Sequence, residues 1–280
     1  AEMFSRKAVE TGREVKIHIA ADTGMCRIGY VPSPEAIEEV KKIAALPGIA
    51  MQGIFTHFSE ADIADKEWAH EQHSRFSAFI DALKAAGVTF NIHHCCNSAG
   101  TLELPDFHRD MIRPGIIQYG YDASKEVLVT GTKIKPVMSL RCCITHLKTI
   151  YEGDCVGYGR QFTAKGPTKI ATLPIGYADG YNRALSSKID VIVHGVRAHQ
   201  VGNICMDQCM IDVSHIPDVK VGDEVVLFGE QGSECVSADE IADTCHTIIH
   251  EITCNINRRV PRVYVQNGKI VQRLEYLTQS

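Results

Sequence analysis

The feature that most constrains this chain is the alternation of apolar β segments with amphipathic helical segments along its first part. Val15–Ala20 and Met51–His57 are β-rich runs, and apolar residues recur at helical spacing in the segment between them. Ser33 as N-cap and Pro34 at the first helical position predict where the intervening helix begins. Repeated strand–helix units with apolar strands predict a parallel sheet covered by helices.

Two further strands extend this pattern. Phe90–His94 is predicted as a third strand, and Met111–Ile117 as a fourth after an irregular connection. About four strands are half of an eight-stranded (β/α)8 barrel of roughly 250 residues. We therefore expect residues 1–127 to form a partial TIM-type barrel, its C-terminal half, within an α/β fold class.

After about residue 124 the sequence changes to short β segments separated by Gly, Asp and Pro. Ser237 and Glu240 form a Ser-x-x-Glu capping box, which predicts one helix continuing as far as Ile248. We expect residues 128–280 to form a mainly antiparallel β domain. Its predicted strands are Pro136–Leu147, Lys169–Pro174, Val191–His194, Cys209–Val213, Glu224–Phe228 and Arg262–Val265.

Composition argues against several kinds of partner. The formal net charge is −5 and no basic run occurs, which disfavours a nucleic-acid partner. The apolar runs are shorter than the ~20 residues of a membrane span.

The histidines and cysteines do not predict a metal site or a disulfide framework. The eleven cysteines include the adjacent pairs Cys95-Cys96 and Cys142-Cys143, which are poor disulfide partners. We interpret the cysteines as mostly buried thiols of a cytoplasmic protein. We expect no metal, because neither His93–Cys96 nor His70-x-x-His73 shows two separated ligand pairs.

Polar residues follow each predicted strand of the first domain. Arg27, His57, Asn97-Ser98 and Arg113 each lie at or just after the C-terminal end of a strand. In a β/α barrel all of these ends open on one face, where catalytic groups collect. The pattern therefore predicts one shared site at this face.

Two glycine-rich segments interrupt the second domain, Pro174–Tyr181 and Val201–Gln208. Their glycines indicate close backbone approach, and the Tyr, Asp and Met beside them are suited to form the wall of a site. Both segments closely resemble signature segments of the alanine racemase family, which are fold-type III enzymes that bind pyridoxal 5′-phosphate (PLP).

The resemblance covers nearly the whole chain and implies a cofactor cradle in the first domain. The segment Thr56-His57-Phe58 resembles the one whose His helps to position the cofactor ring. Ser98 of Asn97-Ser98 would place its hydroxyl on the cofactor phosphate, together with the backbone amides of Gly115 and Ile116. Arg113 would contact the pyridine nitrogen, and His94 would brace Arg113.

The same resemblance implies the substrate side of the site. Gly157-Tyr158-Gly159 is similar to the segment that carries the catalytic tyrosine, which in the family faces the barrel of the partner subunit in a homodimer. Arg27 would face the substrate carboxylate, and Met206 would offer it a backbone N–H. Tyr177 and Arg183 would line the access to the site.

The reaction implied is interconversion of L- and D-alanine, an isomerisation that supplies D-alanine for peptidoglycan precursors. It needs one acid/base on each face of the α-carbon, and the second one in the family is the lysine that holds PLP. No segment here resembles its Lys-Ala-x-Ala-Tyr-Gly context. We therefore expect a C-terminal fragment of the enzyme that is inactive alone.

Smaller departures from the family pattern leave more than one function open. Ala20 and Asn203 stand where some relatives have a lysine and an arginine, and His250 occupies the place of a tyrosine that reaches the cofactor phosphate. A polar residue at 250 leaves serine open as a substrate. A non-catalytic PLP-binding homologue and a decarboxylase are two further hypotheses, and Arg113 disfavours the decarboxylase.

Overall fold

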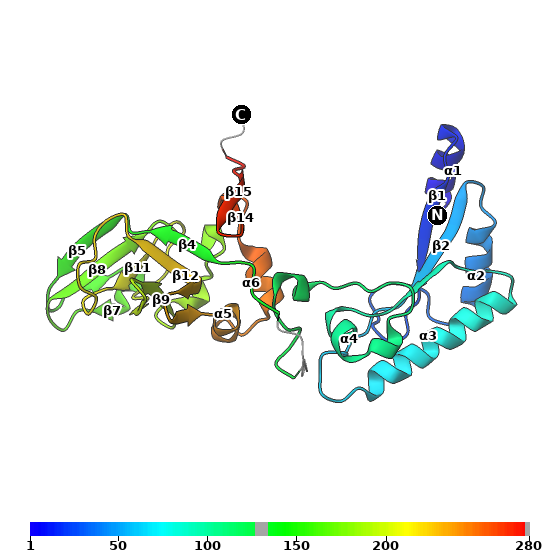
Figure 1. Ribbon diagram of the computed structural model, residues 1–280, viewed down its shortest axis with the longest axis horizontal. Helices are drawn as coiled ribbons and strands as arrows, with labels where there is room; N and C mark the ends of the chain where they lie inside the picture. Colours follow the sequence, from blue (N-terminus) through cyan, green and yellow to red (C-terminus); the bar gives the residue numbers. More distant parts are fainter. Residues whose placement is uncertain (127–133, 278–280) are drawn as a thin grey trace. The chain divides into compact units, whose positions relative to one another are not determined.

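The computed structural model describes residues 1–126 and 134–277, and the chain divides into a first unit, Ala1–Lys135, and a second unit, Pro136–Ser280 (Figure 1). The domain boundary predicted at 127/128 falls outside the described residues. Among the described residues, no helix combines the length and the apolar character that crossing a membrane requires.

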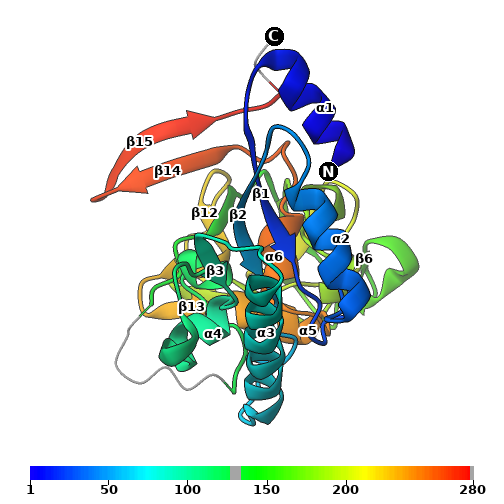
Figure 2. The same ribbon diagram turned by 90° about the vertical axis from the view of Figure 1, so that its right-hand side faces the viewer.

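The first unit is built on a parallel sheet of three strands in the order β1 (Val15–Ala20), β2 (Ile49–Phe55) and β3 (Ile92–His94). The helices α2 (Pro34–Ala44) and α3 (Glu67–Ala85) cover one face of this sheet (Figures 1 and 2). The remaining elements are α1 (Glu2–Thr11), α4 (Ser98–Glu103), η1 (Pro105–Phe107) and η2 (Ile116–Tyr119).

The apolar faces of the helices and the sheet form one core. Val40 of α2 and Phe76 and Leu83 of α3 are fully buried with Ile54 of the sheet. The start of α2 is as predicted, because the Ser33 side chain accepts from the N–H of Ala36 at 3.2 Å and Pro34 opens the helix.

The fourth strand predicted at Met111–Ile117 is wrong. The N–H of Arg113 donates to the carbonyl of Cys96 at 2.9 Å, Pro114 has no N–H, and the chain turns into η2 at Ile116. The backbone of this segment therefore forms a loop and does not hydrogen-bond to a neighbouring strand of the sheet.

The second unit is a set of antiparallel sheets, as predicted. In the larger sheet β12 (Glu224–Gln231) pairs with β9 (Asp190–Val193), β13 (Glu234–Val236) and β4 (Leu140–Cys143), and β9 pairs with β10 (Val196–His199). A second sheet has the order β11 (Cys209–Asp212), β8 (Thr168–Leu173) and β5 (His146–Ile150). The other elements are β6 (Cys155–Val156), η3 (Tyr158–Arg160), β7 (Phe162–Thr163), η4 (Tyr177–Asp179), η5 (Arg183–Leu185), α5 (Ala238–Thr244), α6 (Ile249–Asn255), β14 (Arg262–Gln266) and β15 (Lys269–Leu274).

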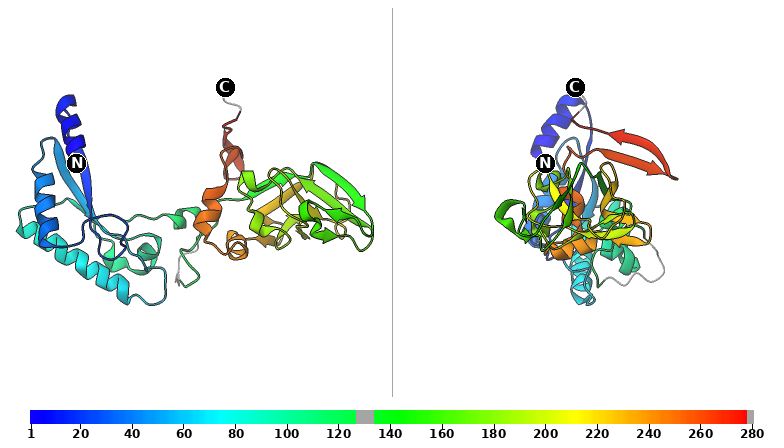
Figure 3. Two further views of the ribbon diagram at one scale, coloured as in Figure 1. Left: turned by 180° about the vertical axis from the view of Figure 1, so that it is seen from behind. Right: turned by 90° about the vertical axis from the view of Figure 1, so that its left-hand side faces the viewer.

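Two predicted elements of this unit are divided in the structure. The segment predicted as one strand from Pro136 to Leu147 forms β4 and β5, which belong to different sheets. Ser237 caps α5 by accepting from the N–H of Glu240 at 3.0 Å, as predicted, but the helix ends at Thr244 and Ile248 is the N-cap of α6. The ribbon of β14 and β15 projects from α6 (Figure 3).

All eleven cysteines are free thiols. The prediction that they are mostly buried is wrong, because only Cys95, Cys96 and Cys209 are buried and four others are exposed.

Candidate active site

The carboxyl ends of the three parallel strands lie at one edge of the sheet. Ala20, Phe55 and His94 are in register across β1, β2 and β3, so the residues that follow them leave the sheet together. These are the segments that carry Arg27, His57 and Asn97-Ser98. The first unit thus brings the predicted strand-end residues to one edge.

Arg113 is held at this edge by four acceptors. Its Nη1 lies 2.5 Å from Nδ1 of His94, and its Nη2 donates to the carbonyl of Thr56 at 2.8 Å and to that of Cys95 at 3.3 Å. Nη2 also lies 3.4 Å from Nδ1 of His57. A guanidinium only donates, so both histidines accept at Nδ1 and carry their proton at Nε2.

This tautomer assignment extends away from Arg113. Nε2–H of His94 donates to Nδ1 of His18 at 2.9 Å, and Nε2–H of His18 then faces the side-chain oxygen of Gln52 at 3.4 Å. The prediction that His94 braces Arg113 is therefore confirmed by the geometry, and His18 and Gln52 are partners that the sequence did not reveal.

Both histidines that accept from Arg113 are kept neutral. Burial, followed by the positive charge of Arg113, lowers the pKa of His94 to about 4. Burial also lowers the pKa of His57, and the charges of Arg113 and Arg27 act in the same direction. Arg27 itself is exposed in the loop after β1.

Ser98 and Gly115 come together on neighbouring loops. The N–H of Gly115 donates to the Ser98 hydroxyl at 2.9 Å, which leaves the Ser98 proton free to donate. A Cβ at position 115 would lie 3.7 Å from the same hydroxyl, so the absent side chain leaves room there. The Ser98 hydroxyl and Arg113 form a donor set that fits the phosphate and ring nitrogen of PLP, while the Gly115 N–H is bonded to Ser98 in this structure. Ile116, the first residue of η2, buries its side chain.

Asn97 has a structural role at this place. Its side-chain oxygen accepts from the N–H of Gly100 at 3.0 Å and caps α4, and its amide donates to the carbonyl of Phe58 at 3.4 Å. The contact of Asn97 with a cofactor stays a prediction.

In the second unit Tyr158 is 74% exposed and stands in the turn η3. The side-chain amide of Asn203 donates to the carbonyl of Tyr158 at 2.7 Å. This bond ties the tyrosine turn to the segment Val201–Gln208. Asn203 therefore has a positioning contact that the sequence did not predict.

The two glycine-rich segments are joined to each other. The N–H groups of Tyr177 and Ala178 donate to the carbonyls of Cys205 and Met206 at 3.1 and 3.0 Å. A Cβ at Gly176 would lie only 2.2 Å from the Cys205 carbonyl oxygen, so only glycine permits this approach. The side chains of Met206 and Tyr177 are 55% and 43% exposed.

The joined segments are further fixed by Arg259. Its Nε donates to Asp179 at 2.7 Å, and its Nη2 pairs with Asp207. Asp179 in turn accepts from the N–H of Gly176 at 2.8 Å. One arginine thus connects η4 with the Met206 turn.

Tyr177 and Arg183 border a hollow of about 460 Å³ together with Gly180, Asn182 and Asn255. This location is compatible with the predicted access role. His250 is exposed on α6, and its contact with a phosphate stays a prediction.

The described residues contain no group of three or more His, Cys, Asp or Glu side chains arranged to hold a metal ion. The histidines considered for a metal have other partners. His93 pairs with Asp110 at 2.8 Å, and His73 stacks on Phe107 with ring centroids 3.8 Å apart.

Comparison with known proteins places the chain in a family. The sequence model of the alanine racemase N-terminal domain matches residues 1–123, and that of the C-terminal domain matches residues 137–264. Alanine racemase 1 of Clostridium acetobutylicum is 46% identical over 277 residues, which are 99% of this chain and 72% of the relative. The alanine racemase of Clostridium kluyveri is 44% identical over 280 residues, covering 100% of this chain and 72% of the relative.

Solved structures of alanine racemases also resemble this chain. The alanine racemase of Clostridium difficile 630 superposes with a TM-score of 0.93 at 40% identity, over 98% of this chain and 70% of that one. The alanine racemase of Bacillus anthracis with bound L-Ala-P gives a TM-score of 0.91 at 35% identity, over 99% and 72% of the two chains.

A barrel-type α/β unit followed by an antiparallel β unit, with the donor set described above, defines a fold-type III PLP-dependent enzyme. Within this class the chain belongs to the alanine racemase family, whose members are PLP-dependent isomerases.

Proposed function

We propose that this chain is part of an enzyme that interconverts L- and D-alanine with two acid/base groups. The proposal rests on the position of Arg113. His94 and the Thr56 carbonyl hold its guanidinium at the sheet edge where His57 and Ser98 also lie. A donor-only, permanently charged side chain at this place is suited to the pyridine nitrogen of PLP.

The cofactor would be held by residues of the first unit. The Ser98 hydroxyl and the amides of Gly115 and Ile116 would bind its phosphate, and His57 would position its ring beside Arg113. Bound PLP withdraws electrons from the α-carbon of an amino acid and so makes its proton acidic. His250 would add a contact to the phosphate.

In the proposed homodimer, the first unit of one subunit and the second unit of its partner would then handle the substrate. The exposed phenol of Tyr158 would take or return the α-proton on one face, with its turn held by Asn203. Arg27 and the backbone N–H of Met206 would bind the carboxylate, and Tyr177 and Arg183 would line the access. We propose a homodimer in which Tyr158 faces the barrel of the partner subunit.

The lysine that would act on the other face of the α-carbon is the acid/base group that we do not find in this sequence. The Lys-Ala-x-Ala-Tyr-Gly type of segment does not occur in these 280 residues. Within the described part of the first unit, Lys41 and Lys42 form ion pairs with glutamates of α2, and Lys66 pairs with Glu103. We therefore propose that the three-stranded sheet is part of a larger barrel, and that these 280 residues alone are inactive.

The test joins to this chain the part of the Clostridium acetobutylicum relative that it does not span, where we expect the lysine segment, and measures D-alanine formed from L-alanine by chiral chromatography. We expect racemisation by the joined protein and none by the 280-residue chain. At stoichiometric PLP, borohydride should fix the cofactor to no single lysine of the 280-residue chain in preference to its other exposed lysines, as judged by peptide mass spectrometry. Racemisation by the chain alone would contradict the need for the added lysine.

The same experiment decides between alanine racemisation and two competing functions. Faster turnover of L-serine than of L-alanine by the joined protein would support a serine racemase. Reversible PLP binding without turnover of either amino acid would support a non-catalytic homologue.

A further inference from the structure

Gln72 is a polar residue in the core of the first unit. It lies on α3 and is 0% exposed, on the same buried face of the helix as Ala69 and Phe76. Burying a side-chain amide away from water costs free energy unless its donors and acceptor form hydrogen bonds within the protein. An amide at this depth therefore indicates a specific bonding role.

The contacts of Gln72 use both ends of its amide. Its Nε2 donates to the carbonyl of His57 at 3.1 Å and faces the hydroxyl of Thr23 at 3.5 Å. Its Oε1 accepts from the N–H of Ser59 at 2.9 Å and from the Ser59 hydroxyl at 3.2 Å. The bonds to His57 and Ser59 enclose a three-residue stretch of the loop after β2.

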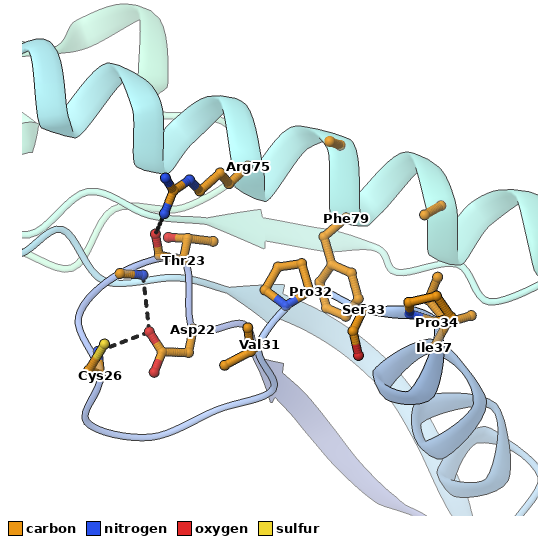
Figure 4. Close-up of a pocket in the computed structure, with 13 residues that line it drawn as sticks. Asp22, Thr23, Cys26, Val31, Pro32, Ser33, Pro34, Ile37, Arg75 and Phe79 are labelled. Carbon is orange, nitrogen blue, oxygen red and sulfur yellow. Dashed lines mark hydrogen bonds between the residues drawn. The ribbon is translucent and has the colours of Figure 1, made fainter.

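The contact with Thr23 links this stretch to the loop after β1, which carries Arg27. The hydroxyls of Thr23 and Thr56 are 2.6 Å apart, and Nη1 of Arg75 lies 3.5 Å from the Thr23 carbonyl (Figure 4). Helix α3 thus contacts the loops after two neighbouring strands. Gln72 contacts both of them through one side chain, by a bond to the His57 carbonyl and by facing the Thr23 hydroxyl.

We propose that Gln72 is a positioning residue that holds His57 against Arg113 by fixing the backbone on both sides of the histidine. On one side Arg113 binds the Thr56 carbonyl at 2.8 Å, and on the other Gln72 binds the His57 carbonyl and Ser59. The benefit for the cofactor ring rests on the proposed function, whereas the positioning of His57 does not.

The experiment uses the 280-residue chain with isotope-labelled histidine and follows the titration of His57 by NMR. Gln72→Met keeps the length of the side chain and removes all its hydrogen bonds. The loosened loop admits water to the imidazole, so we expect the pKa of His57 to rise by about half a unit or more. Gln72→Glu should behave like the native chain near neutral pH, because a buried, protonated carboxyl still accepts from Ser59 and donates to His57.

Gln200→Met is the matched control. Gln200 is also 0% exposed, and it binds the N–H of Ser187 and the carbonyl of Gly202 at 2.6 and 2.9 Å in the second unit. The Gln200→Met variant should leave the titration of His57 unchanged. Should Gln72→Met not fold, Gln72→Asn replaces it, because its shorter amide withdraws from the His57 carbonyl, and it should raise the pKa of His57 in the same direction.

An unchanged His57 titration in a folded Gln72→Met or Gln72→Asn chain would overturn the proposal. PLP binding is measured separately by the fluorescence of Trp68, and Gln72→Met should weaken it on the order of tenfold. If the native chain binds no PLP while the titrations behave as expected, the cofactor role fails and the positioning role stands.

Discussion

Nδ1 of His94 lies 2.5 Å from Nη1 of Arg113, and the histidine is the acceptor of this bond. Its Nε2–H then donates to His18 at 2.9 Å. The buried imidazole is therefore bonded on both sides only while it is neutral. Protonation of His94 would place a donor against a donor and a positive charge beside Arg113.

Stability of the first unit should fall as the pH is lowered from about 6.5 toward 4. The pKa of His94 is lowered to about 4 in the folded chain, so the unfolded chain binds the proton more tightly. Between pH 7.5 and pH 5 this single group should remove at most about 2 kcal/mol from the free energy of unfolding. Urea unfolding followed by the fluorescence of Trp68, the only tryptophan, measures this share together with those of His57 and His73, whose pKa values are also lowered. A free energy of unfolding equal at both pH values would contradict the assignment.

Removing the charge of Arg113 should raise the pKa of His94. Arg113→Met takes away a positive charge that adds to the effect of burial, and a rise of about one unit is expected by NMR titration. Arg109→Met is the reciprocal control, because Arg109 contributes to the pKa of His73, which burial chiefly lowers to about 4. Arg109→Met should raise the pKa of His73 and leave the pKa of His94 unchanged. Equal effects of both variants on His94 would argue against a specific Arg113–His94 contact.

Gly176→Ala should destabilise the second unit by roughly 2–3 kcal/mol or more. Its Cβ would lie 2.2 Å from the carbonyl oxygen of Cys205 and 2.4 Å from that of Met206, so the two glycine-rich segments must separate. Gly166→Ala is the control, since a Cβ there meets nothing within 4 Å, and it should change stability by less than about 0.5 kcal/mol. Urea unfolding followed by far-UV circular dichroism compares the two. Similar stabilities would show that the approach at Gly176 is not required.

Local signals in the sequence predicted the parts of the fold that depend on local chemistry. Ser33, Pro34 and Ser237 stand at the helix starts where capping chemistry predicts them. Parallel strands place their ends at one edge, so the grouping of His57 and Ser98 could also be predicted, whereas Arg113 reaches this edge from a loop. The fourth strand was wrong because an apolar run does not reveal that its N–H groups bind a loop carbonyl.

Contacts between distant segments could not be predicted in this way. Gln72 occupies an apolar helical face four residues before Phe76, which is a visible signal of a polar core residue. Its partners, however, are 13 to 49 positions away in the sequence. The bond between Asn203 and Tyr158 spans 45 positions and involves a backbone carbonyl, which no side-chain pattern shows.

The central claim is that Tyr158 is one of two acid/base groups, and exchange of the α-hydrogen with deuterated water tests it most directly. The measurement uses the joined protein that carries the added lysine segment, with Tyr158→Phe. Because Tyr158 is 74% exposed, we expect Tyr158→Phe to lower the free energy of unfolding by no more than about 0.5 kcal/mol.

We expect racemisation by the Tyr158→Phe protein to fall by a factor of about 10² to 10⁴. Exchange at the α-carbon should persist for one enantiomer of alanine, whose proton the lysine takes, and should be lost for the other. Racemisation at the native rate, or equal exchange of both enantiomers, would contradict the account.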